Sequence, residues 1–113
     1  MIDYAARVAL GVEWLDEVHP GWRDKVDTDR LKMYNTHQCI LGQVFGTYWR
    51  PVDEMFYDGE DQSGRLGFNI PQQMLNDIHD QYFDEKITAD EREDLVNWEY
   101  AHLENEWRKA LSV

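Results

Sequence analysis

The sequence contains a single cysteine, Cys39, among its 113 residues, so no intrachain disulfide can form. This scarcity excludes a secreted scaffold held together by disulfides. Basic residues are also few: 11 lysines and arginines stand against 23 aspartates and glutamates, which gives a formal net charge of −12. A chain this acidic repels nucleic acid, so we do not expect it to bind DNA or RNA directly.

Long apolar runs are missing as well. No uncharged apolar stretch approaches the roughly 20 residues that a membrane-spanning helix needs. The first residues, MIDYAARVALGVEWLDE, lack the basic start and the long uncharged core of a signal peptide. We therefore expect a cytoplasmic protein that does not enter a membrane.

Motifs of catalysis and metal binding are absent: there is no phosphate loop, nucleophile elbow, zinc spacing or dinucleotide fingerprint. Glu99 and His102 have the spacing used in di-iron bundles, but no second such pair accompanies them. A calcium loop that started at Asp58 would need glycine and glutamate where Ser63 and Asn69 stand. We predict no catalytic residues, no metal and no other cofactor.

The residues that are present suffice for a core. Hydrophobic residues make up 42% and aromatic residues 13% of the chain, which fits one domain over residues 1–113. Thr88 and Glu91 form a capping box, and residues 51–69 mix turn residues with acids, which predicts a long irregular loop. The sequence therefore predicts an all-α, compact single-domain bundle of about four main helices, near residues 3–18, 37–50, 70–86 and 89–111.

Two glycines, Gly42 and Gly46, lie four residues apart in the second predicted helix. Each costs a helix about 1 kcal/mol relative to alanine. At 100° per residue they share one arc with Cys39, beside a broad arc of large apolar side chains. We expect Cys39, Gly42 and Gly46 to form a buried structural groove, with a backbone or an aromatic ring such as Trp22 or Trp107 against it. The alternative is an open groove that holds a ligand or a partner helix.

The negative charge is concentrated in one half of the chain. Residues 1–50 carry seven acids and six bases, whereas residues 51–113 carry sixteen acids and five bases. A basic partner protein suits this half, and the plainer alternative is a solvated surface that aids solubility. The candidate partner-binding residues are the aromatic, apolar and acidic groups of the predicted loop and one aromatic of the last helix: Phe56, Tyr57, Asp58, Glu60, Asp61, Leu66, Phe68 and Trp98.

A succession of short motifs runs through most of the chain: LDE (15–17), PGW (20–22), VDTDRLKM (26–33), CILGQVFGTYW (39–49), LGF (66–68) and the terminal pattern Tyr100-x-x-Leu103-x-x-x-Trp107. This succession resembles a group of small proteins encoded by actinobacteria and their bacteriophages. The stretch C-x-L-G-Q-x-F-G-x-Y is its specific part. The resemblance implies a phage or actinobacterial cytoplasm, and it transfers no catalytic residue to this chain.

We therefore expect a small phage-type protein that acts without catalysis, by binding a host protein and inhibiting or redirecting it. One alternative is an acidic DNA mimic that inhibits a nucleic-acid-binding protein. Two others are an enzyme or ligand-binding protein built around the glycine groove, with Cys39 or a histidine in its site, and a self-associating module. In that module Leu10 and Trp14, or Leu95 and Trp98, would pair across a homodimer.

Overall fold

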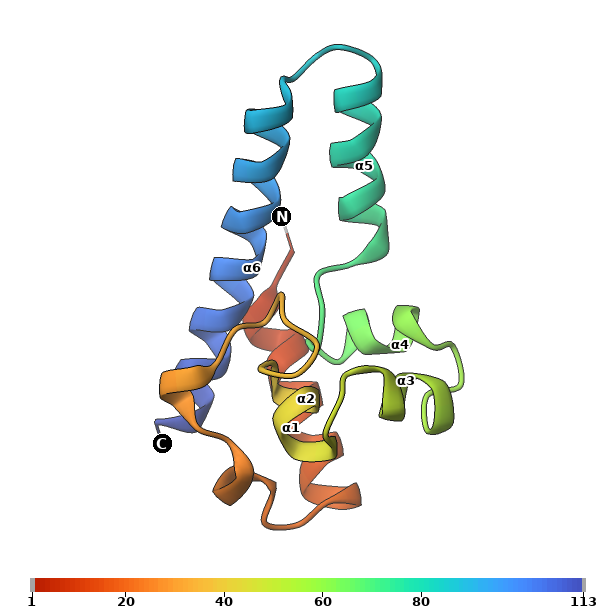
Figure 1. The fold of residues 1–113 in the computed structure, drawn as a ribbon. Helices are drawn as coiled ribbons and strands as arrows, with labels where there is room; N and C mark the ends of the chain where they lie inside the picture. The colour runs from red at the N-terminus through yellow and green to blue at the C-terminus, as the bar shows by residue number, and fades with distance from the viewer. Residues whose placement is uncertain (1, 113) are drawn as a thin grey trace.

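The computed structural model describes residues 2–112, and its longest helices, α1 (Tyr4–Val18) and α6 (Ala89–Leu111), pack against each other (Figure 1). Asp3 caps α1 by accepting a hydrogen bond from the backbone N–H of Ala6, and the capping box of Thr88 opens α6. Residues 2–112 contain no strand, so the all-α class is confirmed. The remaining helices are α2 (Ile40–Phe45), α3 (Trp49–Glu54), α4 (Glu60–Arg65) and α5 (Gln72–Phe83), with 3-10 turns at Trp22–Lys25 and Thr28–Arg30.

The single helix predicted over residues 37–50 is wrong, because the chain breaks there into α2 and α3. Gly46 ends α2 with a φ of 96°, and its backbone N–H donates to the carbonyl of Gly42. Glycine is favoured at such a helix end because a side chain strains a positive φ. Cys39 begins α2 as its N-cap, and its Sγ accepts a hydrogen bond from the N–H of Gly42.

The predicted groove of Cys39, Gly42 and Gly46 is not formed. Gly42 is buried, and a Cβ atom there would lie only 2.7 Å from the carbonyl carbon of His37, so a neighbouring backbone does approach closely. Gly46 is exposed, and a Cβ atom there would meet nothing within 4 Å. The atoms nearest to a Cβ at Gly42 belong to the backbone of Thr36 and His37, and not to Trp22 or Trp107.

The long irregular loop predicted over residues 51–69 is also wrong. The segment contains most of α3 and all of α4, joined by a short turn. Gly59, at the N-cap of α4, has a φ of 57°, which places the turn before that helix. Phe56 and Phe68 from this segment are buried and stack with an interplanar angle of 14°. The segment therefore contributes side chains to the core, although its turn around Tyr57 is exposed.

Aromatic side chains form the centre of that core. The ring of Phe68 stacks on Trp107 with centroids 5.4 Å apart, and Trp22 meets Trp107 edge to face at 6.1 Å. The indole N–H of Trp107 donates to the carbonyl of Gly67. Gly11 of α1 leaves room for this cluster, since a Cβ there would overlap the carbonyl oxygen of Leu66. These contacts join α1, the α4–α5 connection and α6.

A buried polar pair also joins α1 to α6, at a position on α6 that is nearer its N-terminus than Trp107. The hydroxyl of Tyr4 donates a hydrogen bond to a carboxylate oxygen of Glu99. Glu99 is only 8% exposed. Burial, and then the hydrogen bond to Glu99, raise the pKa of Tyr4. Tyr4 therefore stays a neutral donor, and the pair holds the N-terminus of α1 to the middle of α6.

Beyond this pair, α5 and the N-terminal half of α6 run side by side and extend away from the other helices (Figure 1). The molecule is accordingly elongated, with principal extents of 46 × 29 × 24 Å. The positive φ of 61° at Glu85 turns the chain between the two helices. In the part of the chain that is described, no helix has the length and apolar character for crossing a bilayer.

Candidate functional site

The extended part of the molecule, residues 72–98, is here named the acidic hairpin. It carries two bases, Lys86 and Arg92, against eight acids, so its net charge is −6, half of that of the whole chain. Within residues 2–112, none of these acids has an ion-pair partner. Their charge is therefore not neutralised inside the molecule. The eight acids are Asp77, Asp80, Asp84, Glu85, Asp90, Glu91, Glu93 and Asp94.

Arg92, a cation of the acidic hairpin itself, is engaged with an aromatic ring. Its guanidinium carbon lies 4.1 Å from the centroid of the Tyr82 ring, a cation–π arrangement that links α6 to α5. Two of the acids have local hydrogen bonds: Asp77 accepts from Gln73, and Glu91 accepts from the backbone N–H of Thr88. The other acids extend their carboxylates into solvent, which gives the hairpin a strong negative field.

Large apolar side chains are exposed on the same acidic hairpin. Phe83 is 74% exposed, Trp98 is 50% exposed and Leu95 is 39% exposed. Ile78 is the only residue of the hairpin that is fully buried. Isolated exposed apolar residues are ordinary, but three large ones on a segment with so little core leave apolar area that a partner can cover.

The apolar groups and the acids of α6 lie next to each other. Leu95 and Trp98 are three residues apart, so they lie on one face of the helix. Glu91 stands one turn before Leu95, and Asp94 stands one turn before Trp98. The ring of Trp98 also packs on His102, with centroids 3.9 Å apart. This arrangement places an apolar anchor among carboxylates, which can bind a basic surface that has an apolar hollow.

The predicted partner-binding residues of 51–69 divide into exposed and buried groups. Tyr57 is 97% exposed in the turn between α3 and α4, and Asp58, Glu60 and Asp61 beside it are exposed too. Asp58 pairs with Arg65 at 2.7 Å. Leu66 is half-buried, and Phe56 and Phe68 belong to the core, so the last two cannot contact a partner. Trp98 lies on the hairpin instead, far from this turn along the chain.

Cys39 is placed as a packing and capping group. It is 1% exposed, and burial raises the pKa of its thiol to about 11. A neutral, enclosed thiol is a poor nucleophile. Glu99 and His102 do not share a site, because Glu99 is buried against Tyr4 while His102 is exposed against Trp98. Among residues 2–112, no group of three His, Cys, Asp or Glu side chains is arranged to hold a metal ion.

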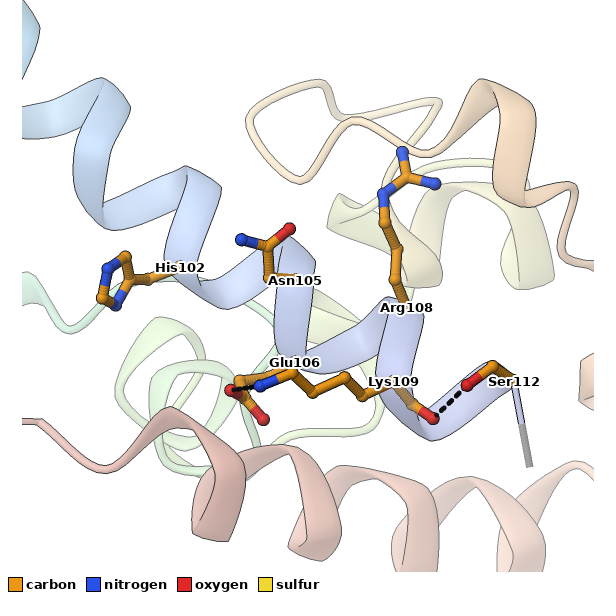
Figure 2. A pocket seen from close by; sticks show the side chains of 6 residues that line it. All are labelled: His102, Asn105, Glu106, Arg108, Lys109 and Ser112. Atoms are coloured by element: carbon orange, nitrogen blue, oxygen red, sulfur yellow. Dashed lines mark hydrogen bonds and ion pairs between the residues drawn. The ribbon is translucent and has the colours of Figure 1, made fainter.

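A hollow beside the C-terminal end of α6 does not form a second convergent site (Figure 2). Its side chains point in different directions from a single helix. Arg108 donates to the backbone carbonyls of Thr28 and Leu31, so its charge stabilises that turn. Lys109 pairs with Glu106 at 3.0 Å. The residues around this hollow are His102, Asn105, Glu106, Arg108, Lys109 and Ser112.

The sequence indicated the acidity of the second half and suggested Trp98, which is 50% exposed, but it did not predict the acidic hairpin as a unit. Phe83 and Leu95 are amphipathic-stripe residues, and their spacing alone does not say which ones lack a tertiary partner. Comparison of the chain with protein families, with curated proteins and with solved structures gives no match. The functional argument therefore depends on the geometry of this surface.

Proposed function

We propose that this protein is a non-enzymatic binding protein whose acidic hairpin docks on a basic protein surface. The observation that carries the proposal is the combination of eight acids without ion-pair partners and the exposed Phe83, Leu95 and Trp98 on one segment of residues 2–112. Aromatic anchors supply most of the energy in many interfaces, whereas complementary charge speeds association and fixes orientation. The hairpin offers both.

The resemblance to small actinobacterial and bacteriophage proteins supports a host protein as the partner, with binding in the host cytoplasm. Tyr57, Asp58, Glu60 and Asp61 extend the acidic surface at a second place, and a large partner can contact them as well as the hairpin. Self-association through the hairpin is disfavoured, because two segments of −6 each repel one another. A homodimer through α1 could use Leu10, which is 50% exposed, but not Trp14, which packs inward against Phe45, Phe56 and Phe68.

Affinity capture from an actinobacterial lysate tests the proposal with matched variants. The hairpin variant carries Phe83→Ser and Trp98→Ser, and the control carries Leu10→Ser and Val18→Ser, which remove two exposed apolar side chains from α1. We expect wild type and control to retain the same protein, the hairpin variant to lose it, and added salt to weaken retention. Equal retention by the hairpin variant contradicts the proposal.

A DNA-mimic version of the proposal places the same acidic hairpin in the nucleic-acid site of a DNA-binding partner. The elongated run of unneutralised carboxylates favours this version. Competition with duplex DNA separates the DNA-mimic version from docking on another basic surface. The DNA displaces the protein if the hairpin occupies the partner's nucleic-acid site, and it leaves the complex intact if the hairpin binds elsewhere on the partner. The measurement is the amount of captured partner released by added DNA.

A further inference from the structure

A small pocket lies where the acidic hairpin meets the rest of the chain. Residues from five segments line it, including Tyr34, Tyr48, Trp49, Glu60 and Tyr100. Its volume is about 240 Å³. Pockets for drug-sized ligands measure roughly 300–1,000 Å³. This one therefore suits a small molecule or the end of a single side chain.

Four of the aromatic residues that line this pocket form two pairs. Tyr34 and Tyr100 meet edge to face with centroids 6.4 Å apart, and Tyr48 and Trp49 do the same at 5.1 Å. Tyr34 is 62% exposed and Trp49 is 45% exposed, so parts of both rings can be reached from solvent. The face of an aromatic ring carries partial negative charge and attracts a cation.

Polar groups at the base of the pocket are held by hydrogen bonds to one another. Tyr100 donates its hydroxyl hydrogen to Oδ1 of Asn69 at 2.8 Å, and the amide nitrogen of Asn69 donates to the Tyr48 hydroxyl at 3.4 Å. The Tyr48 hydroxyl also bonds to Ser63. Because Tyr100 uses its hydrogen in this way, its oxygen lone pairs stay available to accept a hydrogen bond from a ligand.

The charge of the pocket lining is of one sign. Glu60 is its only carboxyl side chain, and among the described residues that line it there is no lysine, arginine or histidine. Burial raises the pKa of Tyr100 to about 12 and that of Cys39 to about 11, so both are neutral at pH 7. An anion would find no positive partner here, whereas a cation would find aromatic faces and a carboxylate.

We propose that this pocket binds an organic cation, an alkylammonium or guanidinium group whose carbon atoms contact the rings of Tyr34 and Trp49 while its charge faces Glu60. Aromatic cages bind such groups through cation–π attraction. A free amine and a lysine or arginine side chain of a bound protein offer the same chemistry. The proposal rests on the pocket alone and does not depend on the docking of the acidic hairpin.

NMR titration of the intact protein with choline tests this proposal, and the matched probe is 3,3-dimethyl-1-butanol, the neutral carbon analogue of choline. We expect choline to shift the indole N–H of Trp49 and the ring resonances of Tyr34. Cation–π attraction of about 0.5–2 kcal/mol corresponds to a preference of roughly 2- to 30-fold over the neutral analogue. Measurable but equal binding of choline and its neutral analogue overturns the proposal.

Two variants with matched controls locate the site. We expect Trp49→Leu and Glu60→Gln each to weaken choline binding several-fold. The controls are Trp98→Leu, which removes a tryptophan of similar exposure outside the pocket, and Asp61→Asn, which removes the neighbouring acid; both should bind as wild type does. Should Trp49→Leu fail to fold, Glu60→Gln still decides. Equal choline affinity in Glu60→Gln and Asp61→Asn overturns the role of Glu60 and with it the proposal.

Nα-acetyl-lysine amide and Nα-acetyl-arginine amide distinguish a protein side chain from a free amine as the source of the cation. Tighter binding of either amide than of choline supports the cation pocket and assigns it to a protein side chain. Tighter binding of choline supports the pocket and assigns it to a free amine. Failure of choline and both amides to bind overturns the proposal. The capture of a partner protein by the Phe83→Ser, Trp98→Ser variant tests the acidic hairpin and has no bearing on this pocket.

Discussion

The globule, residues 2–71 and 99–112, and the acidic hairpin, residues 72–98, differ in what their large side chains contact. In the globule Trp22, Phe68 and Trp107 are each at most 1% exposed and pack on one another. In the hairpin Phe83 and Trp98 are 74% and 50% exposed. The two helices of the hairpin contact each other along one seam, and Leu75 and Val96 pack against the core of the globule. The difference indicates that the large buried side chains that stabilise the fold lie in the globule, whereas the hairpin buries few of its own.

The largest effect we predict is on the globule, from Gly11→Ala. An alanine methyl there would overlap the carbonyl oxygen of Leu66 and lie 3.1 Å from the Trp107 ring. Alanine favours a helix by about 1 kcal/mol over glycine, but overpacking against a fixed backbone costs more. We expect the free energy of unfolding, measured by urea denaturation, to fall by about 3 kcal/mol or more.

The matched control is Gly64→Ala in α4. Its methyl would lie 3.5 Å from the Cα of Pro71, an ordinary contact, so we expect unchanged or slightly higher stability. If Gly11→Ala proves as stable as Gly64→Ala, the close packing of α1 on the Trp107 cluster is contradicted.

Amide hydrogen exchange of the free protein compares the two regions directly. The hairpin has one fully buried residue, Ile78, so we expect its α5 amides to exchange by local opening. The opening free energy of α5 should lie at least about 2 kcal/mol below that of the amides around Leu15 and Leu103, which need global unfolding. Equal protection in both regions would show that the hairpin is part of one cooperative core.

Alkaline pH should destabilise the globule through Cys39. Burial raises the pKa of its thiol from 9.0 to about 11. The folded state therefore holds this proton more tightly than the unfolded state, and the resulting stability is complete below about pH 9 and is lost as the pH rises through 11. Cys39→Ser removes the titrating group and puts a hydroxyl oxygen in place of Sγ as the N-cap acceptor. Between pH 8 and pH 11 we expect the free energy of unfolding of wild type, measured by urea denaturation, to fall by about 1–2 kcal/mol more than that of Cys39→Ser. Equal falls in the two proteins would contradict the burial of the thiol.

The parts of this fold that sequence predicted are those decided by local chemistry. The apolar spacing of α1, α5 and α6 and the capping box of Thr88 and Glu91 involve residues a few positions apart. Gly46 shows the limit. Its place in the apolar pattern fits a helix interior as well as a helix end, and only the tertiary arrangement selects the left-handed backbone that ends α2.

The candidate site was predicted less well than the fold. Tyr57, Asp58, Glu60, Asp61 and Trp98 are exposed as a contact surface requires. Phe56 and Phe68 were assigned to a loop surface because turn residues surround them, yet they stack inside the core. The acidic hairpin itself depends on how far α5 and α6 extend beyond the other helices, which no local pattern encodes.

The smallest effect concerns the charge of the hairpin. Asp80→Asn with Asp94→Asn removes two acids that have no ion-pair partner within residues 2–112. Relief of repulsion should raise the free energy of unfolding by a few tenths of a kcal/mol, about what surface charges contribute. The control is Glu13→Gln with Glu17→Gln, which removes the same number of acids from α1, outside the hairpin. A clear loss of stability in the hairpin variant, seen by thermal melting, would mean that these carboxylates stabilise the fold.

The most direct test of the hairpin as a binding surface is amide hydrogen exchange of the protein alone and in complex with its captured partner. The account predicts that α5 and the N-terminal half of α6, which open locally in the free chain, become strongly protected in the complex. The exposed face of α1 around Leu10 should be unchanged. Protection that appears on α1 and leaves residues 72–98 as they were would contradict the account.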